Sequence, residues 1–509
     1  MRTLSCLAFA CAMLAAAAAS ASQGEGYPSR GKAIDELLPA SDYSDVLANR
    51  PRAVGIMRSR GQGFVPSPEL TEYAQSVLDR LLRGVPLPPS FHPQVRILAT
   101  PEFAGECTPD GTLVITVGLL ELLENEDELA FVLGHEVSHA IYRHQVADWY
   151  KKAQFYAVVN GAAVDVVALS AARSIGGHTG DNILRGLDVA QHLAKLSANV
   201  LMPQMAKDQE DAADALGFDL MVRAGYDPDA SLAVMDKLGE QEAEAEQAAA
   251  EARQAAKTGG SGGGFTLGKG FGILGTIASG GRPSKDQIAD IAIFAFDSAV
   301  DSMADDATTH HPAREREDLL SDYEYREYRV LAPVTPTPLP WDPASRSPLK
   351  PHLVAMLGHY TQAENAAAYI ADRNQGTDSG AHASVVQSVA APTEDHAYTE
   401  FVASEYYDNT GQKGQSEAAL VKAVQSPEPS WEVYSRLIDI YMQKAQYPKA
   451  DALMAQAVTR FEDSPVLLPK RIALFRTEGR QSDAQALIPE CKNVGIDELT
   501  DECKKAAGG

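Results

Sequence analysis

The sequence has little basic charge, and this excludes one large class of proteins. Its 509 residues include 44 lysines and arginines against 69 aspartates and glutamates, for a net charge of −25. A nucleic-acid-binding protein needs a basic face that displaces counterions from phosphates. The chain also lacks a run of about 20 apolar residues free of charges and breakers, which argues against a multi-span membrane protein. With 45% hydrophobic residues, it has the composition of a globular protein of several domains.

The N-terminus has the pattern of a secretory signal. A positive charge at Arg2 precedes an apolar stretch over residues 4–19, and small side chains lead up to Ala21. This order is typical of a cleaved signal peptide rather than of a membrane anchor. We therefore predict that residues 1–21 are removed and that the mature protein is exported to the periplasm, with outer-membrane association as a further possibility.

Cysteine is scarce as well. Of five cysteines, two precede the predicted cleavage site. The remaining three are too few for the disulfide framework of a small secreted domain. Cys491 and Cys503, in the same C-terminal helical region, could form one bridge, which would leave Cys107 as the odd thiol.

Apolar periodicity outlines a first folded domain, for which we predict the boundaries 61–332. A polar stretch over 22–60 reads as an N-terminal arm. Helical spacing of apolar residues follows over 70–82, and alternation typical of strands over 95–98 and 112–117. A further helix is expected from Asn125 to about His144.

The remainder of this domain contains less regular segments. Residues 153–205 are Ala-rich and helical in pattern, and the stretch 155–172 is apolar enough for a buried or interfacial helix, with peripheral membrane contact as an alternative. Residues 240–257 predict a solvated helix, and residues 258–282 a Gly-rich insert. The Pro-rich residues 333–351 indicate a linker, because repeated proline keeps a chain extended.

Beyond the linker, over residues 352–509, similar residues return every 34 positions. Three registers agree, namely Tyr407, Tyr441 and Phe475; Gly411, Ala445 and Gly479; and Ser416, Ala450 and Ala484. Bulky residues, turn residues and small contact residues at this period resemble tetratricopeptide repeats. An irregular helical domain with chance coincidences is the alternative. Repeat arrays commonly bind peptides or partner proteins.

The chemistry of the first domain centres on a His-Glu-x-x-His pentapeptide within the helix expected over 125–144. His135 and His139 are four residues apart and therefore project from one helical face, where both imidazoles can reach a single metal ion. Glu136 is the next residue after His135, and its carboxylate can reach a water bound to that ion. Zinc lowers the pKa of a bound water, and a carboxylate takes its proton.

A third ligand is expected downstream on a second helix. Glu210 and Asp214 are again four residues apart. One carboxylate can complete the metal site, and the other can accept the second ring N–H of a ligand histidine. His144 follows His139 too closely to fold back onto the same ion.

The residues around this motif resemble a known family. The runs 118–121 and 133–139 are similar to the zinc metallopeptidase family of CAAX prenyl proteases, HtpX and OMA proteases, over about residues 65–330. The resemblance implies that Glu210 is the third zinc ligand. The stretch 309–312 is similar to the family's Thr-His-Pro element, which implies that His311 lies near the metal. It would either steady the reacting carbonyl or, as in a BepA-like periplasmic branch, cap the zinc.

Two positions depart from the pattern of that family. Ala206-Lys207 stands where Ser-Arg usually precedes the third ligand, and Ala104-Gly105 stands where an Asn-Ala pair is common on the strand beside the active site. In relatives this strand binds the substrate backbone as an added strand. Main-chain hydrogen bonding survives such changes, so they bear on substrate preference more than on catalysis.

Together these patterns predict an α+β, mainly helical protein. A zincin-like metallopeptidase domain with a small sheet would precede a tetratricopeptide-like α-solenoid. We expect one zinc ion per chain, held by His135, His139 and Glu210, with Asp214 behind a ligand histidine. Glu136 would be the general base, and His311 a second catalytic candidate.

The predicted function is a zinc-dependent endopeptidase of the bacterial cell envelope that hydrolyses misfolded or assembling envelope proteins. The alternative is a latent protease that acts mainly as a periplasmic chaperone or adaptor, docking its repeats on the outer-membrane assembly machinery. A degenerate pseudoenzyme would normally have lost Glu136 or a ligand, and this sequence retains both.

Overall fold

The structure is a computed structural model of the chain. It describes residues 63–144, 207–258, 311–347, some positions between 351 and 366, and 396–508, with short gaps at 89–90, 99–102, 109–110, 343–344, 463 and 496. Outside these residues lie the predicted signal peptide and N-terminal arm, the segment 153–205 for which the sequence predicts helix, and the Gly-rich insert beyond residue 258.

A small sheet forms the centre of the N-terminal module, a name used here for residues 63–342. Its strands are β1 (Gln94–Leu98), β2 (Gly105–Cys107) and β3 (Thr112–Thr116), in the order β1-β3-β2. β1 runs parallel to β3 and β2 antiparallel to it. β1 and β3 occupy the two segments in which the sequence predicts strands. β2 is too short to show alternation, so only its pairing identifies it.

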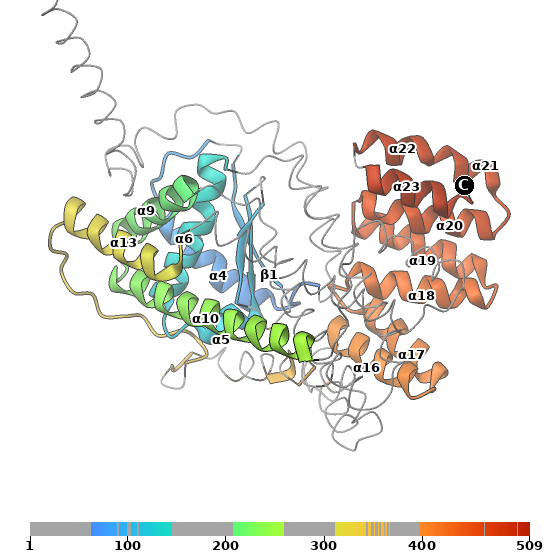
Figure 1. Cartoon of the computed structure of the whole chain (residues 1–509), viewed down its shortest axis with the longest axis horizontal. Coiled ribbons are helices and arrows are strands. Elements are labelled where there is room, and N and C mark those ends of the chain that lie inside the picture. Colours follow the sequence, from blue (N-terminus) through green and yellow to red (C-terminus); the bar gives the residue numbers. More distant parts are fainter. Residues whose placement is uncertain are drawn as a thin grey trace, which may run out of the picture.

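Most helices of this module lie on one side of the sheet, and one long helix runs past its lower end (Figure 1). Leu113 and Ile115 of β3 share a buried core with Leu78 and Leu133, which come from two of these helices. The result is the mainly helical architecture with a small sheet that the sequence predicts. The helices are α4 (Pro68–Leu81), α5 (Val117–Leu122), α6 (Glu126–Tyr142), α9 (Lys207–Ala224), α10 (Asp229–Thr258) and α13 (Ala313–Glu327).

Helix α6 begins and ends at residues suited to those positions. The side chain of Asn125 accepts a hydrogen bond from the backbone N–H of Glu128 at 2.9 Å, which satisfies one of the free donors of the first turn. Acidic residues in that turn complement the helix dipole. The helix ends at Arg143, whose left-handed backbone (φ 57°) turns the chain back.

Helices α6 and α9 cross at a pair of glycines. A Cβ atom built on Gly217 would lie 2.8 Å from the backbone nitrogen of His135, and one on Gly134 would lie 3.1 Å from the carbonyl oxygen of Gly217. These neighbours are backbone atoms and cannot swing aside. The two helices therefore approach closely because neither carries a side chain at the crossing point.

We expect Gly217→Ala to destabilise the protein by about 1–3 kcal/mol. Alanine favours a helix by roughly 1 kcal/mol over glycine, but the clash with the backbone at His135 outweighs that gain. Urea unfolding measures the effect. Gly414→Ala is the matched control, because a Cβ there meets nothing within 4 Å and should be neutral or stabilising. A Gly217→Ala variant as stable as Gly414→Ala would contradict the close crossing.

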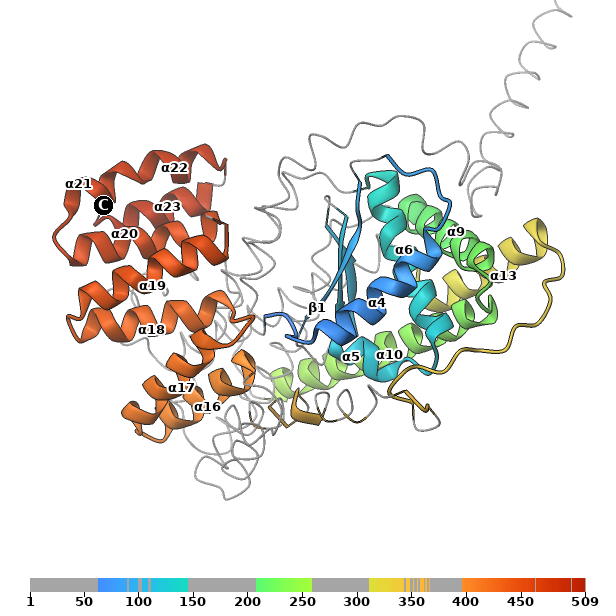
Figure 2. The same cartoon turned by 180° about the vertical axis from the view of Figure 1, so that it is seen from behind.

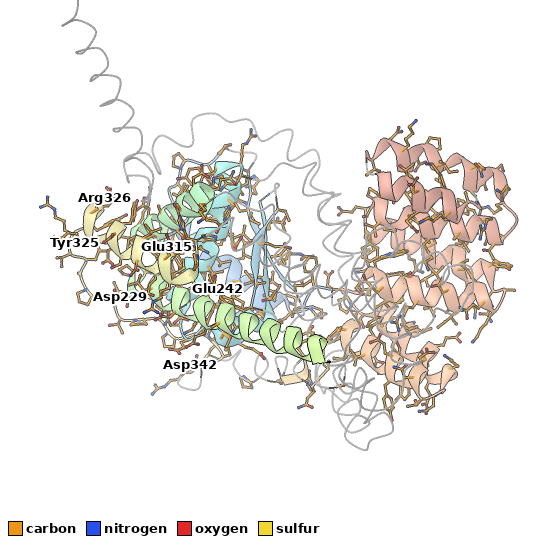
Figure 3. The ribbon with its side chains drawn as sticks, viewed as in Figure 1. Asp229, Glu242, Glu315, Tyr325, Arg326 and Asp342 are labelled. Atoms are coloured by element: carbon orange, nitrogen blue, oxygen red, sulfur yellow. A yellow bond between two sulfur atoms is a disulfide. The ribbon has the colours of Figure 1, made fainter. Side chains whose placement is uncertain are left out.

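The Pro-rich stretch predicted as a linker packs on the helices of the N-terminal module over residues 337–341. The backbone N–H groups of Thr337 and Asp227 both donate to the carboxylate of Asp127, at 2.8 and 2.7 Å. Leu339 is buried. Between Arg326 and Asp342 the chain passes along the helices rather than away from them (Figure 3). This extended stretch therefore ties the start of α6 to the α9–α10 turn.

The C-terminal helices, residues 396–508, form a stack at one side of the N-terminal module in both views (Figures 1 and 2). The first pair shares the buried core of the module, through residues that include Val402 and Ala419. Arg96 of β1 also lies 3.5 Å from Glu428. The helices are α16 (Ala397–Asn409), α17 (Lys413–Gln425), α18 (Trp431–Gln443), α19 (Tyr447–Arg460), the 3₁₀ helix η3 (Pro465–Leu467), α20 (Leu468–Thr477), α21 (Gln481–Ala486), α22 (Ile488–Asn493) and α23 (Asp497–Ala506).

The 34-residue period of the sequence corresponds to one repeated turn between paired helices. Gly411, Ala445 and Gly479 all have a left-handed backbone, with φ of 80°, 53° and 82°. In each case the N–H of the next residue donates to the carbonyl five positions earlier, on the three bulky residues Tyr407, Tyr441 and Phe475, at 2.7–2.8 Å. The small residues of the third register are buried. The chain therefore repeats a helix–turn–helix unit.

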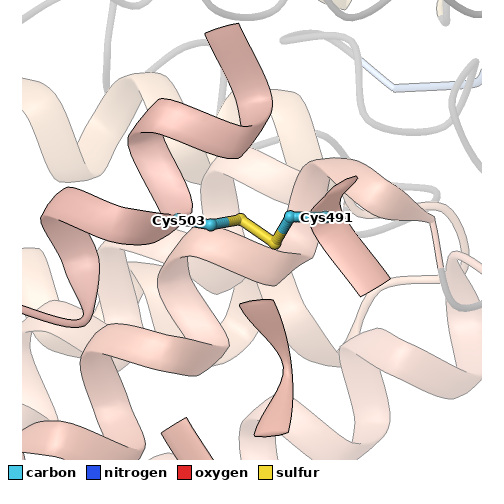
Figure 4. The surroundings of a disulfide bond; sticks show 2 residues. All are labelled: Cys491 and Cys503. Carbon is cyan, nitrogen blue, oxygen red and sulfur yellow. A yellow bond between two sulfur atoms is a disulfide. The ribbon is translucent and has the colours of Figure 1, made fainter. Parts of the chain in front are cut away.

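A disulfide joins Cys491 of α22 to Cys503 of α23, as the sequence suggests (Figure 4). Cys107 does not take part in this disulfide and lies buried on β2. Among the helices that the structure describes, none combines the length and the hydropathy needed to cross a membrane.

Candidate metal centre

Two histidines and a glutamate converge where α6 and α9 cross. The Nε2 atoms of His135 and His139 lie 3.1 Å apart. The carboxylate oxygens of Glu210 lie 3.5 Å from each of them. Within the described parts of the chain, these three residues form the one group of histidine, cysteine and acidic side chains able to hold a metal ion.

The spacing of these atoms fits zinc. Ligands about 2.0–2.1 Å from a tetrahedral zinc ion lie roughly 3.3 Å from one another. The three observed separations, 3.1, 3.5 and 3.5 Å, scatter around that value. Three protein ligands of the His, His and Glu type are also the donor set of catalytic zinc sites, which leave a fourth position open. The residues present therefore fit the ion that the sequence predicts.

Asp214 lies behind His135. Its Oδ1 is 2.8 Å from the Nδ1 of His135, and its side chain is fully buried. Burial alone would raise the pKa of Asp214, but the guanidinium of Arg316 and the imidazole of His135 hold that pKa well below its usual range. In turn the contact with Asp214 raises the pKa of His135 against the opposing effect of burial. Asp214 is therefore an ionised group that orients the ring.

Arg316 is the residue at this site that the sequence does not reveal. Its Nε and one terminal nitrogen donate to the two oxygens of Asp214, at 2.8 and 2.7 Å, in a buried bidentate pair. The same guanidinium lies 3.5 Å from Glu210. Arg316 thus ties α13 to both carboxylates of α9. It stands in the charged run 314–318, which has the pattern of a solvated helix face and gives no signal of burial.

Glu136 lies between α6 and the edge strand β2. Its side chain is buried, and a Cβ on Gly105 would lie only 2.9 Å from its Oε1. Burial raises the pKa of Glu136 to about 7, against the lowering effect of His135 and with help from Glu210 and Glu106. A carboxyl group with a pKa near neutrality is well matched to proton transfer. The glycine at position 105 leaves the space that Glu136 occupies.

His311 lies just before α13 and beside α9. Its Nε2 is 3.7 Å from Asp211, the neighbour of Glu210, and its Nδ1 is 2.9 Å from Glu315. Glu242 of α10 accepts a hydrogen bond from the N–H of Ala313 at 3.1 Å and so fixes the start of α13 (Figure 3). The structure thus places His311 next to the turn of α9 that carries Glu210, in contact with two carboxylates. Thr309 and His310 lie outside the described residues.

His144 faces the side of His139 that points away from the metal position. The Nδ1 atoms of the two rings lie 3.0 Å apart. Burial, together with the positive charge of His135, lowers the pKa of His144 to about 4. Burial and the neighbouring histidines also lower the pKa of His139 well below its usual value. Both rings are therefore held neutral, which is the form that binds a metal.

The comparison with known proteins agrees with this arrangement. Residues 68–316 match the sequence profile of peptidase family M48. The chain is 29% identical over 146 residues to the mitochondrial metalloendopeptidase OMA1 of Arabidopsis thaliana, across 29% of this chain and 26% of that protein. It is 25% identical over 233 residues to the beta-barrel assembly-enhancing protease of Yersinia pestis, across 42% and 44% of the two chains.

A third relative, the OMA1 metalloendopeptidase of Schizosaccharomyces pombe, is 26% identical over 186 residues, across 36% of this chain and 48% of its own length. The chain thus matches between about a quarter and a half of the length of these relatives. The family match contains both histidines of α6, Glu210 and Asp214 of α9, and Arg316 of α13. Residues 68–316 of this chain belong to peptidase family M48.

Proposed function

We propose that the chain is a zinc-dependent endopeptidase of the bacterial cell envelope, acting on misfolded or assembling envelope proteins. The observation that carries this proposal is the convergence of His135, His139 and Glu210 at zinc-ligand spacing, with the buried carboxyl of Glu136 beside them. The Cys491–Cys503 disulfide supports an exported protein, because such bonds persist in oxidising compartments.

In this mechanism the ligands and their neighbours hold the geometry while Glu136 moves the proton. The ion, when bound, supplies Lewis-acid chemistry that acidifies water and polarises a peptide carbonyl. Glu136 takes the proton of the attacking water on a carboxylate oxygen and returns it to the leaving amine nitrogen. Asp214 keeps the ring of His135 oriented, and Arg316 keeps Asp214 ionised.

The substrate backbone would lie along β2. This strand is the last of the sheet among the described residues, and a Cβ on its Gly105 would meet the carboxyl group of Glu136. An extended peptide that pairs with this edge would place a peptide bond beside the metal position. Main-chain pairing recognises unfolded segments with little sequence preference, which suits substrates that are misfolded or still assembling.

Removal of the metal tests the proposal directly. We expect purified residues 22–509 to contain one zinc ion per chain and to cleave an unfolded protein such as casein. A zinc chelator should abolish cleavage, and added zinc should restore it with saturation at one ion per chain. Elemental analysis and a fluorescent casein assay provide the two measurements. Cleavage that continues at full rate in zinc-free protein would exclude a zinc peptidase.

The second candidate function is a latent protease that works mainly as a chaperone or adaptor in outer-membrane protein assembly. It is supported by the repeated helix pairs, which we interpret as tetratricopeptide-like repeats, and by the similarity to beta-barrel assembly-enhancing proteases. In this case the repeats would dock on a partner, and the peptidase site would be opened only on demand.

His311→Ala separates the two candidates. If His311 steadies the developing oxyanion, its loss should lower activity by about 100-fold or more. If it caps the metal in a latent enzyme, its loss should raise activity. The measurement is casein cleavage by wild type and variant at equal zinc occupancy. Unchanged activity would show that His311 has neither role.

A further inference from the structure

Each ligand histidine has a different partner behind it. The Nδ1 of His135 faces the carboxylate of Asp214 at 2.8 Å, whereas the Nδ1 of His139 faces the imidazole of His144 at 3.0 Å. The ring nitrogen of a metal-binding histidine that points away from the metal normally donates its N–H to an acceptor. His144 occupies the position of that acceptor for His139.

The end of α6 builds this contact. Arg143 takes a left-handed conformation, and the backbone N–H of His144 then donates to the carbonyl oxygen of His139 at 3.0 Å. The turn brings the side chain of His144 back onto the last turn of the helix. The ring of Tyr142 lies parallel to that of His144, at an interplanar angle of 2° and a centroid distance of 5.1 Å. Backbone and side chain together thus fix the position of the His144 ring.

The positions of the protons follow from the chemistry of the site. The Nε2 of His139 needs a free electron pair to bind a metal, so its N–H must be on Nδ1. The Nδ1 of His144 must then accept that hydrogen bond, and His144 carries its own proton on Nε2. Because Nδ1 of His144 lies 3.0 Å from Nδ1 of His139, this hydrogen bond holds the His139 ring with its Nε2 pointing toward Glu210 and His135.

We propose that His144 is a positioning residue for the metal site, which selects the tautomer and the ring orientation of His139. The proposal rests on the proposed zinc function. It predicts that the loss of the acceptor, rather than the loss of the ring, weakens zinc binding.

Three variants separate these effects. His144→Phe keeps a flat ring that can stack on Tyr142 but has no acceptor. His144→Asn loses the ring but places an amide oxygen near the position of Nδ1. His92→Phe makes the same substitution at an exposed histidine away from the site and serves as the control.

The measurements are the zinc dissociation constant of each metal-free variant, by competition with a chromogenic chelator, and the midpoint of its thermal unfolding without zinc. We expect His144→Phe to bind zinc about 10- to 100-fold more weakly than wild type, while its zinc-free form unfolds at the wild-type temperature. His144→Asn should recover most of the affinity, and His92→Phe should match wild type.

Two outcomes would overturn the inference while leaving the proposed function intact. One is equal zinc affinity in His144→Phe and wild type. The other is weak binding in both His144 variants together with a lower unfolding temperature of their zinc-free forms, which would make His144 a structural residue only. Failure of wild type itself to bind zinc would instead overturn the proposed function, and the inference with it.

Discussion

Glu136→Gln is expected to keep one zinc ion per chain and to lose peptidase activity by about 10²- to 10⁴-fold. Glutamine has the shape of glutamate, and the space beside Gly105 that Glu136 occupies would accommodate it. Its amide cannot accept a proton from water, so the water would have to lose that proton without a base. The three metal ligands are untouched, and zinc binding should therefore persist.

Casein cleavage at saturating zinc and elemental analysis of the same sample measure the two halves of this prediction. Glu72→Gln, an exposed residue of α4, is the matched control and should behave as wild type in both. A Glu136→Gln variant that cleaves at close to the wild-type rate would show that another group is the base. A variant that loses zinc as well would place Glu136 among the groups that hold the ion.

Glu210→Ala is expected to reduce zinc affinity by more than about 100-fold and to abolish activity at ordinary zinc concentrations. Loss of an outer partner of a ligand typically costs 10- to 100-fold in metal affinity, and loss of a direct ligand should cost more. The fold should survive, because Arg316 keeps its bidentate pair with Asp214 when Glu210 is truncated.

Zinc titration of the metal-free protein and its thermal unfolding with and without zinc check this prediction. Wild type should be stabilised by zinc, since a ligand that binds only the folded state raises its stability. Glu210→Ala should show no such increase. Asp208→Ala, an exposed acidic residue in the first turn of the same helix, is the control and should respond to zinc like wild type. Stoichiometric zinc in Glu210→Ala would show that the ligand set is wrong.

The sequence predicts the local parts of this protein well, because their geometry depends only on neighbouring residues. Four residues separate His135 from His139, which is about one helical turn, so the two rings share a face wherever the helix lies. The 34-residue period is local in the same way. A glycine at position 411 or 479 permits the left-handed turn that ends one helix and starts the next.

The tertiary structure alone decides which distant side chains reach the site. Glu210 and Asp214 have equivalent positions on one helix face, and the sequence leaves either of them as a ligand until a family resemblance is used. The close crossing at Gly134 and Gly217 sets how α9 lies on α6, with Glu210 at the metal position and Asp214 behind His135.

The position of Arg316 is even harder to predict from the sequence. Its neighbours in the sequence are charged, and it becomes buried only because α13 packs beside α9 and brings it to the carboxylates of Glu210 and Asp214. Helix spacing is encoded within a few residues. Arg316 and Asp214 are about a hundred residues apart in the sequence. Whether two such side chains meet depends on how whole helices pack, and a local sequence pattern does not determine that packing.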